Sequence, residues 1–131
     1  MDENVLEISI AGSRTIRDRY TEYEIMCITN SKAFGKCYTK VYRRYSDFLR
    51  LHCRLRCLVE ILPEFPKKKW KKLCRNVVEE RMKMLAIYMK FICDYVLHKE
   101  DNAEKIEQDV ASFMKDKGTE TFKHNTLNHS N

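Results

Sequence analysis

Two short segments of the 131-residue sequence concentrate side chains that can bind phosphate. In the first, Arg44 is followed by Tyr45 and Ser46, and a guanidinium group is a rigid planar fork that can hold two phosphate oxygens at once. The second, Lys67–Lys72 (KKKWKK), places five lysines around Trp70. Each lysine near an anionic bilayer contributes about 1 kcal/mol of attraction, and tryptophan favours the boundary between membrane and water. These residues indicate a polyanionic partner: an anionic membrane, a nucleic acid or an acidic protein.

The charge of the chain is distributed in blocks. Between Lys36 and Lys90 there are 16 basic and 5 acidic residues, a net charge of +11, whereas the rest of the chain carries −5. The overall charge of +6 therefore hides one strongly basic stretch between weakly acidic flanks. Such an asymmetry can aim one face of a small domain at a polyanion.

Several classes of protein are not indicated. The sequence has no Walker loop, H-E-x-x-H pair or nucleophile elbow, and the histidines at 52, 98, 124 and 129 form no recognisable triad. We therefore expect a protein that is not an enzyme, with no catalytic residues and no cofactor. No apolar run reaches the ~18 residues of a membrane-spanning helix, and the acidic start is unlike a signal peptide. We expect a cytoplasmic protein.

The six cysteines are interpreted as reduced thiols. Cys53 and Cys57 are four residues apart beside His52, but the second close pair that a zinc site usually shows is missing. We expect no metal site and predict that the cysteines act as small core hydrophobes.

The first third of the chain predicts three strands. Leu6–Ile10 and Tyr20–Thr29 alternate apolar and polar residues, and Lys36–Tyr45 is rich in β-branched and aromatic residues. Gly12 and the polar run 13–19 predict a loop between the first two strands. Short connections favour an antiparallel meander.

A helix is predicted after the third strand. Ser46 can cap it through its hydroxyl group, with Asp47 in the favourable first turn. Pro63 and Pro66 then impose an extended segment. The predicted core stripe of this helix is Phe48, Leu51, Leu55, Leu58 and Val59.

Two further helices are predicted in the second half of the chain. Asn76 and Glu79 resemble a capping box that opens the first, and Asn102 is expected to open the last, with Gly118 at its end. Their apolar stripes are Val78, Met82, Leu85, Met89, Ile92 and Val96, then Ile106, Val110, Phe113 and Met114. The predicted fold class is α+β, a three-stranded antiparallel sheet packed against a helical subdomain. We predict one domain over residues 1–117 and a polar, disordered C-terminal tail over 118–131.

Three segments, in this order and spacing, resemble the PX (phox homology) domain. They are VYRRYSDF (41–48), LPEFPKK (62–68) and VEERMKML (78–85). The resemblance extends from about Val5 to Lys117 and is greatest to the short, single-PX sorting nexins. It implies a PX-like fold with a Pro-rich connecting loop, and a module that binds phosphoinositides. Leu62 stands where the family usually has a proline.

The resemblance also implies roles for individual residues. Arg44 would hold the 3-phosphate of the inositol ring, Tyr45 would form the floor beneath the ring, and Ser46 would lie beside the same phosphate. Lys68 would contact the 1-phosphate, and Arg81 the 4- and 5-hydroxyls. With Arg81 committed to those hydroxyls, a phosphate at either position should fit poorly, which favours phosphatidylinositol 3-phosphate.

In the family, the loop after the Pro-x-x-Pro segment dips into the membrane. We accordingly predict that Trp70 and Leu73 insert, with Lys69, Lys71 and Lys72 at the headgroups. The resemblance implies a cytoplasmic adaptor for protein sorting, peripheral on endosomal membranes, with retromer-type coat and cargo as partners and no nucleic acid.

Alternatives remain open at the level of sequence. One is a PX-like protein-interaction module with altered or lost lipid specificity, and another is a basic nucleic-acid-binding domain. Arg43, beside Arg44, could widen the lipid preference. Tyr45 and Trp70 could be core aromatics, and Lys67–Lys72 a solvated run.

Overall fold

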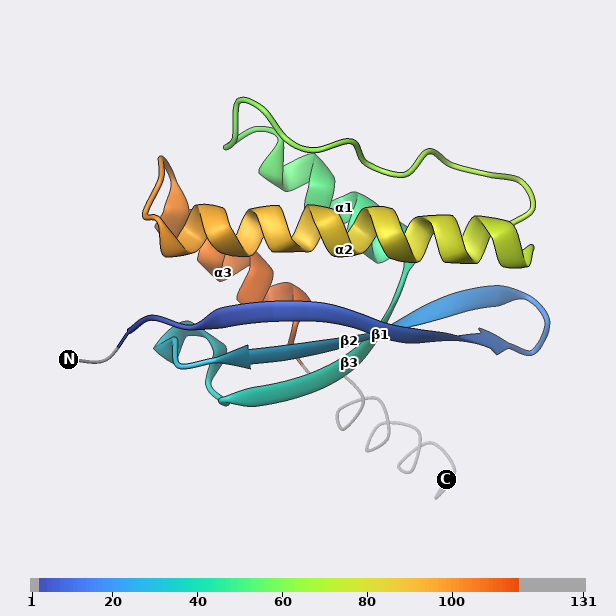
Figure 1. Cartoon of the computed structure of the whole chain (residues 1–131), viewed down its shortest axis with the longest axis horizontal. Helices are drawn as coiled ribbons and strands as arrows, with labels where there is room; N and C mark the ends of the chain where they lie inside the picture. The colour runs from blue at the N-terminus through green and yellow to red at the C-terminus, as the bar shows by residue number, and fades with distance from the viewer. Residues whose placement is uncertain (1–2, 116–131) are drawn as a thin grey trace, which may run out of the picture.

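The structure is a computed structural model that describes residues 3–115, and in it three helices lie on one side of a three-stranded antiparallel sheet (Figure 1). The strand order is β1–β2–β3, which confirms the predicted α+β class and the meander. The strands are β1 (Leu6–Ile16), β2 (Tyr20–Thr29) and β3 (Tyr38–Arg44); the helices are α1 (Tyr45–Leu55), α2 (Arg75–Leu97) and α3 (Ala103–Phe113). The predicted tail 118–131, including Gly118, lies outside the described residues.

β1 is longer than its alternating apolar residues indicate. Its register shifts between Ile10 and Gly12, a β-bulge, and pairing with β2 then continues to Ile16 opposite Tyr20. Arg17 and Asp18 turn the chain with positive φ angles of 49° and 54°. The predicted loop over 13–19 is therefore wrong for its first four residues, because Ala11 is the extra residue of the bulge and pairing with β2 resumes at Gly12.

The junction between β3 and α1 also differs from the prediction. Tyr45 opens α1 instead of ending the strand, so Ser46 lies inside the first turn and does not cap the helix. The carboxylate of Asp47 accepts a hydrogen bond from the Arg44 backbone N–H at 2.8 Å. Asp47 thus accepts from the backbone N–H of the residue that precedes the helix. This is one of the two reciprocal hydrogen bonds of a capping box.

The segment between α1 and α2, residues 56–74, is here called the strap. It runs extended above the helices in Figure 1, as its two prolines predict. Phe65 fixes it in the middle: its ring stacks on His52 at 4.4 Å between centroids and contacts Tyr88 edge-on. The His52 Nδ1 is 2.8 Å from the Tyr88 hydroxyl oxygen.

α2 begins without the capping box that the sequence predicts, whereas α3 begins directly after Asn102, as predicted. α2 starts at Arg75 with Cys74 in the cap position, so Asn76 is already helical. Asn102 precedes α3 in a left-handed conformation and donates from Nδ2 to the Leu58 carbonyl oxygen at 2.9 Å. Asn102 therefore opens α3 as predicted, and its side chain ties the strap to the start of that helix instead of bonding to the first turn.

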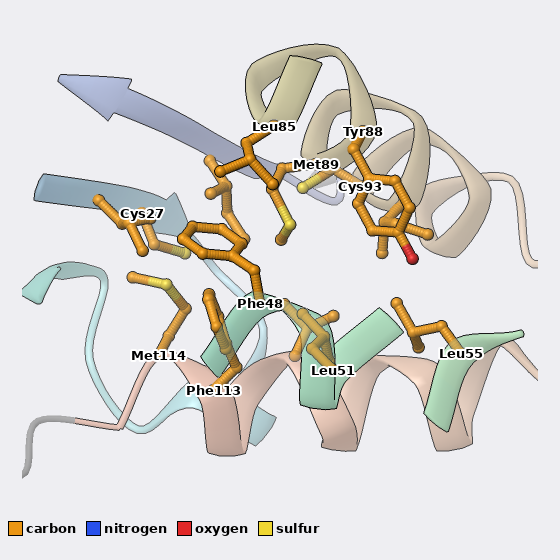
Figure 2. Close-up of a cluster of buried hydrophobic side chains, with 14 of the residues drawn as sticks. Cys27, Phe48, Leu51, Leu55, Leu85, Tyr88, Met89, Cys93, Phe113 and Met114 are labelled. Atoms are coloured by element: carbon orange, nitrogen blue, oxygen red, sulfur yellow. The ribbon is translucent and has the colours of Figure 1, made fainter. Parts of the chain in front are cut away.

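The core lies between the sheet and the helices and contains the apolar stripes predicted for α1, α2 and α3 (Figure 2). Of the six cysteines, Cys27 and Cys93 are buried in it, and burial raises their thiol pKa values to about 11 and about 12. The other four cysteines, at 37, 53, 57 and 74, are exposed, so the prediction of core cysteines is wrong for them. Only Cys53 of these four belongs to a helix or strand, and the other three lie in connecting segments, where sequence spacing predicts no buried face.

Arg43 has a structural position. It is buried, and its Nε and one Nη donate to the carbonyl oxygens of Phe113, at 2.8 Å, and of Lys115. Successive strand residues point to opposite faces, which sends Arg43 and Arg44 in opposite directions. The expectation that Arg43 could widen the lipid preference is therefore wrong, because its guanidinium group holds the end of α3.

Candidate functional site

A cavity of about 560 Å³ lies where the start of β2, the β3–α1 junction, the strap and the first turns of α2 meet. We call it the cationic cavity. In Figure 1 the end of the strap and the start of β2 lie toward the right-hand end of α2, and the β3–α1 junction lies closer to the middle of that helix. Its lining residues are Tyr20, Thr21, Arg44, Tyr45, Ser46, Lys68, Lys69, Trp70, Lys72 and Arg81.

The lining of the cationic cavity is positively charged. It contains two arginines and three lysines, and no carboxylate among the described residues. Two other cavities are larger, at about 730 and 720 Å³. The first mixes two lysines with three glutamates, and the second has lysines without a guanidinium group. Only the cationic cavity, among these three, combines arginines with aromatic rings.

Arg44 is positioned from the end of β3. Its guanidinium carbon lies 3.9 Å from the centroid of the Tyr20 ring, and the side chain is otherwise exposed. β2 and β3 pair antiparallel with Glu22 opposite Arg44, so Tyr20, two residues away on the same face, is its diagonal neighbour. Stacking on a ring orients the guanidinium plane and leaves its N–H groups free for an anion.

Arg81 reaches the cavity from the core-facing stripe of α2. It is only 4% exposed, its guanidinium carbon lies 4.0 Å from the centroid of the Tyr45 ring, and its Nε has no hydrogen-bond partner. None of the ion pairs found in residues 3–115 includes Arg81. A buried cation without a carboxylate costs stability, so its place beside a cavity indicates a ligand that supplies the missing acceptors.

Tyrosines around Arg81 remain neutral hydrogen-bonding groups. Burial raises the pKa of Tyr45, and the charge of Arg81 opposes part of that rise. Burial likewise raises the pKa of Tyr23, which lies in the core next to Arg81. The site therefore keeps its positive charge because neither phenol ionises near neutral pH.

Two hydrogen bonds fix the basic loop, Lys67–Lys72, at its ends. The Tyr45 hydroxyl donates to the Pro66 carbonyl oxygen at 2.6 Å, and the Thr21 hydroxyl donates to the Lys72 carbonyl oxygen at 3.1 Å. Tyr45 belongs to α1 and Thr21 to β2, so the loop is held against two walls of the cavity. This anchoring places Lys68 at the cavity although its side chain is exposed.

Ser46 lines the cavity from the first turn of α1, although it does not cap that helix. The first backbone N–H groups of a helix have no intrahelical acceptor, and the helix dipole adds partial positive charge there. The predicted junction of an arginine, an aromatic ring and a helix start therefore exists, with Asp47 in the capping role instead of Ser46.

The predicted membrane-contact residues are all exposed. Trp70 is 99% exposed, so the possibility of a core tryptophan is excluded. Lys69, Trp70 and Lys72 also line the cavity, whereas Lys71 and Leu73 do not. Leu73 is 40% exposed. The structure thus brings together all five predicted headgroup residues and leaves Lys71 and Leu73 on the outer surface of the loop.

Tyr20 and Thr21 are functional candidates that the sequence analysis does not identify. Both belong to the start of β2, where the alternation pattern marks only a strand. The signal that could have revealed Tyr20 is the strand register, which places an aromatic ring diagonally across from Arg44.

Residues 3–115 offer few other chemistries. This part of the chain contains no group of three or more His, Cys, Asp or Glu suited to a metal ion. Within the same range, no helix combines the length and apolarity required to cross a bilayer.

Comparisons with known proteins agree with the fold. A family model described as "PX domain" matches residues 31–114. Sorting nexin-3 of Aspergillus oryzae is 32% identical over 120 residues, covering 87% of this chain and 81% of the relative. Sorting nexin-3 of Schizosaccharomyces pombe is 34% identical over 102 residues, with 72% and 71% covered. A solved structure titled "X-ray structure of a designed CISK-PX domain" is similar, with a TM-score of 0.64 and 29% identity over 84% of this chain and 99% of that chain.

Proposed function

The chain belongs to the PX domain family, and on that premise we propose that it is a sorting-nexin-type adaptor that recognises phosphatidylinositol 3-phosphate on endosomal membranes. The observation that carries the proposal is the cationic cavity, in which two arginines, each stacked on a tyrosine, line one concavity with three lysines and no carboxylate. The PX domain that we propose spans residues 1–117, around the matched range 31–114.

The two arginines differ in burial, and we propose different roles for them on that basis. Arg44 is exposed and can meet a phosphate from the solvent side, while Arg81 is buried and stacked on Tyr45. We assign the 3-phosphate to Arg44 with Ser46 beside it, and the 4- and 5-hydroxyls to Arg81. A buried donor stacked on a ring favours hydroxyls over a further, strongly hydrated phosphate, which supports specificity for a lipid phosphorylated at position 3 alone.

The remaining headgroup contacts come from Tyr45 and Lys68. Tyr45 forms the floor of the cavity and carries Arg81 on its ring. Lys68 lies on the basic loop, the part of the lining that faces outward. We assign it the 1-phosphate, because this phosphate connects the ring to the lipid tails and must lie on the membrane side.

The basic loop supplies the second attachment. One headgroup rarely holds a soluble domain on a bilayer, and stable recruitment generally requires another signal. We propose that Trp70 and Leu73 enter the interface while Lys69, Lys71 and Lys72 contact anionic headgroups. The exposure of all five side chains supports this arrangement.

The role in sorting rests on the relatives. They are named sorting nexins, and we propose for this chain the same kind of role, a peripheral, non-catalytic adaptor with retromer-type coat and cargo as partners.

The test is a sedimentation assay with liposomes that each contain one phosphoinositide. We expect binding to phosphatidylinositol 3-phosphate above all others, and its loss in Arg44→Ala. Arg54→Ala, which removes the same charge from an exposed position on α1, should bind as the parent does. Equal binding to every phosphoinositide, or equal effects of the two variants, would contradict specific recognition.

Competition separates this function from nucleic-acid binding. Soluble inositol 1,3-bisphosphate should release the protein from liposomes at concentrations that leave any oligonucleotide complex intact. If an oligonucleotide competes as well as the soluble headgroup, the basic surface acts as a general polyanion binder and the proposal fails.

A further inference from the structure

A second concave surface lies at the other end of α2. It has a volume of about 430 Å³ and is formed by the start of the strap and the C-terminal turns of α2. In Figure 1 this start of the strap lies above the C-terminal half of α2. We call this surface the acidic groove. Its lining residues are Val59, Glu60, Ile61, Phe91, Asp94, Tyr95, His98 and Glu100.

An apolar stripe on α2 leads into the acidic groove. Ile87, Phe91 and Tyr95 are spaced by four residues, so they follow one face of α2, away from the core-facing stripe. Phe91 and Tyr95 line the groove, and Ile87 lies one helical turn before them, outside the lining. Ile61 and Ile87 are 76% and 65% exposed, and the rings of Phe91 and Tyr95 lie 6.1 Å apart. Contiguous exposed apolar side chains with a polar rim are typical of an interaction surface.

The rim of the groove is negatively charged. Three carboxylates, Glu60, Asp94 and Glu100, belong to its lining, against one histidine and no lysine or arginine. The Lys90 Nζ lies 3.4 Å from a carboxylate oxygen of Asp94. Because both side chains are exposed, this ion pair offsets little of the negative charge of the rim. This charge contrasts with the basic half of the molecule and repels anionic lipid and nucleic acid.

We propose that the acidic groove docks a basic segment of a partner protein, in which an apolar side chain is flanked by lysine or arginine. The apolar side chain would cover Ile61, Ile87 and Phe91, and its basic neighbours would pair with the rim. Charge complementarity favours this occupant over a membrane.

The position of the groove permits simultaneous binding of membrane and partner. Arg81 and Tyr95 are 14 residues apart on one helix, which corresponds to about 21 Å along its axis. The cationic cavity and the acidic groove have no lining residue in common. A protein docked on lipid through the cationic cavity would therefore keep the acidic groove accessible to a partner.

The probes for the test are two synthetic peptides without lipid, Gly-Arg-Lys-Leu-Phe-Lys-Arg-Gly and the same peptide with glutamate at each charged position. NMR spectra of the full chain should show saturable shifts at Ile61, Ile87 and Phe91 with the basic peptide. We expect the acidic peptide to bind at least about tenfold more weakly.

Two sets of variants locate the binding. Ile87→Ser with Phe91→Ser should weaken the basic peptide at least about tenfold, because both lose apolar contact. Glu60→Lys with Glu100→Lys should do the same without touching the apolar stripe. The matched control is Ile28→Ser, an apolar residue that is 50% exposed on the sheet and should leave the affinity unchanged.

Several results would overturn the proposal: equal binding of the two peptides, no saturable shift with the basic one, or an equal effect of Ile28→Ser. Shifts at the groove that depend on protein concentration alone would assign it to a second copy, whose basic loop has similar chemistry. Shifts with anionic vesicles would assign it to the membrane. Arg44→Ala should bind the peptide as the parent does, so a failure of lipid recognition leaves this test intact.

Discussion

Trp70 provides a test in which folding and membrane binding separate cleanly. The side chain is 99% exposed, so Trp70→Ala removes almost no contact within the protein and should leave the melting temperature unchanged. A tryptophan buries about 150–250 Å² when it is fully covered, at roughly 25 cal/mol per Å². Insertion of half of that surface into the interface would contribute about 2–3 kcal/mol.

The corresponding loss of affinity for liposomes is roughly 30- to 150-fold, since 1.4 kcal/mol corresponds to a factor of ten. Sedimentation with vesicles that contain phosphatidylinositol 3-phosphate measures this loss, and calorimetry with soluble inositol 1,3-bisphosphate measures headgroup binding alone. We expect the soluble headgroup to bind the variant within about twofold of the parent, because Arg44, Lys68 and Arg81 are untouched.

The matched control is Tyr38→Ala, which removes a 51% exposed aromatic residue from the sheet and should leave liposome binding intact. Equal losses in both assays would mean that Trp70 shapes the cavity instead of entering the bilayer. Undiminished liposome binding would show that the basic loop attaches by charge alone.

Three further predictions concern the rest of the molecule. Arg43→Met should lower the free energy of unfolding by about 2–4 kcal/mol, because it leaves carbonyl groups at the end of α3 without their donor. Urea denaturation measures this loss, and an unchanged midpoint would contradict the structural role of Arg43. Burial lowers the pKa of His52 below its usual 6.5, so the unfolded chain takes up the proton first as pH falls. The free energy of unfolding should therefore be insensitive to this group above pH 6.5 and decrease below it, less steeply in His52→Gln; identical pH profiles would refute the assignment. A thiol reagent should react rapidly with the four exposed cysteines and with Cys27 and Cys93 only after denaturation, whereas six rapid reactions would contradict the core.

The parts of the fold that the sequence predicts are those with a strong local period. β2 and the core stripe of α2 follow directly from alternation and from the 3.6-residue repeat. The same stripe contains the clearest signal for the site, because Arg81 occupies a core-facing position one turn before Leu85. An arginine at such a position requires a partner that the apolar stripe does not supply.

The parts that the sequence does not predict depend on contacts between distant segments. Ser46 has the right chemistry for a cap, but Asp47 reaches the Arg44 N–H because α1 starts two residues earlier than a Ser46 cap requires. Asn102 has a similar capping chemistry and is instead committed to Leu58, 44 residues away. Local propensity cannot distinguish these outcomes, since both are decided by tertiary structure.

Arg43 and Arg44 show the same limit at the site. Adjacent in sequence and identical in type, they differ in their contacts because the strand places them on opposite faces. Arg43 donates hydrogen bonds to the end of α3, while Arg44 stacks on Tyr20 and lines the cavity, a difference that the sequence alone does not predict.

The central claim, that Arg44 and Arg81 recognise one inositol headgroup together, is tested most directly by NMR of the arginine Nε–H groups during titration with inositol 1,3-bisphosphate. The Arg81 Nε has no hydrogen-bond partner in the free protein, so a bound headgroup should change its resonance markedly. We expect the Arg44 and Arg81 resonances to shift together and to saturate at one equivalent of headgroup, while the Arg43 resonance stays unchanged. A headgroup that binds without altering Arg81, or that shifts Arg43 equally, would contradict it.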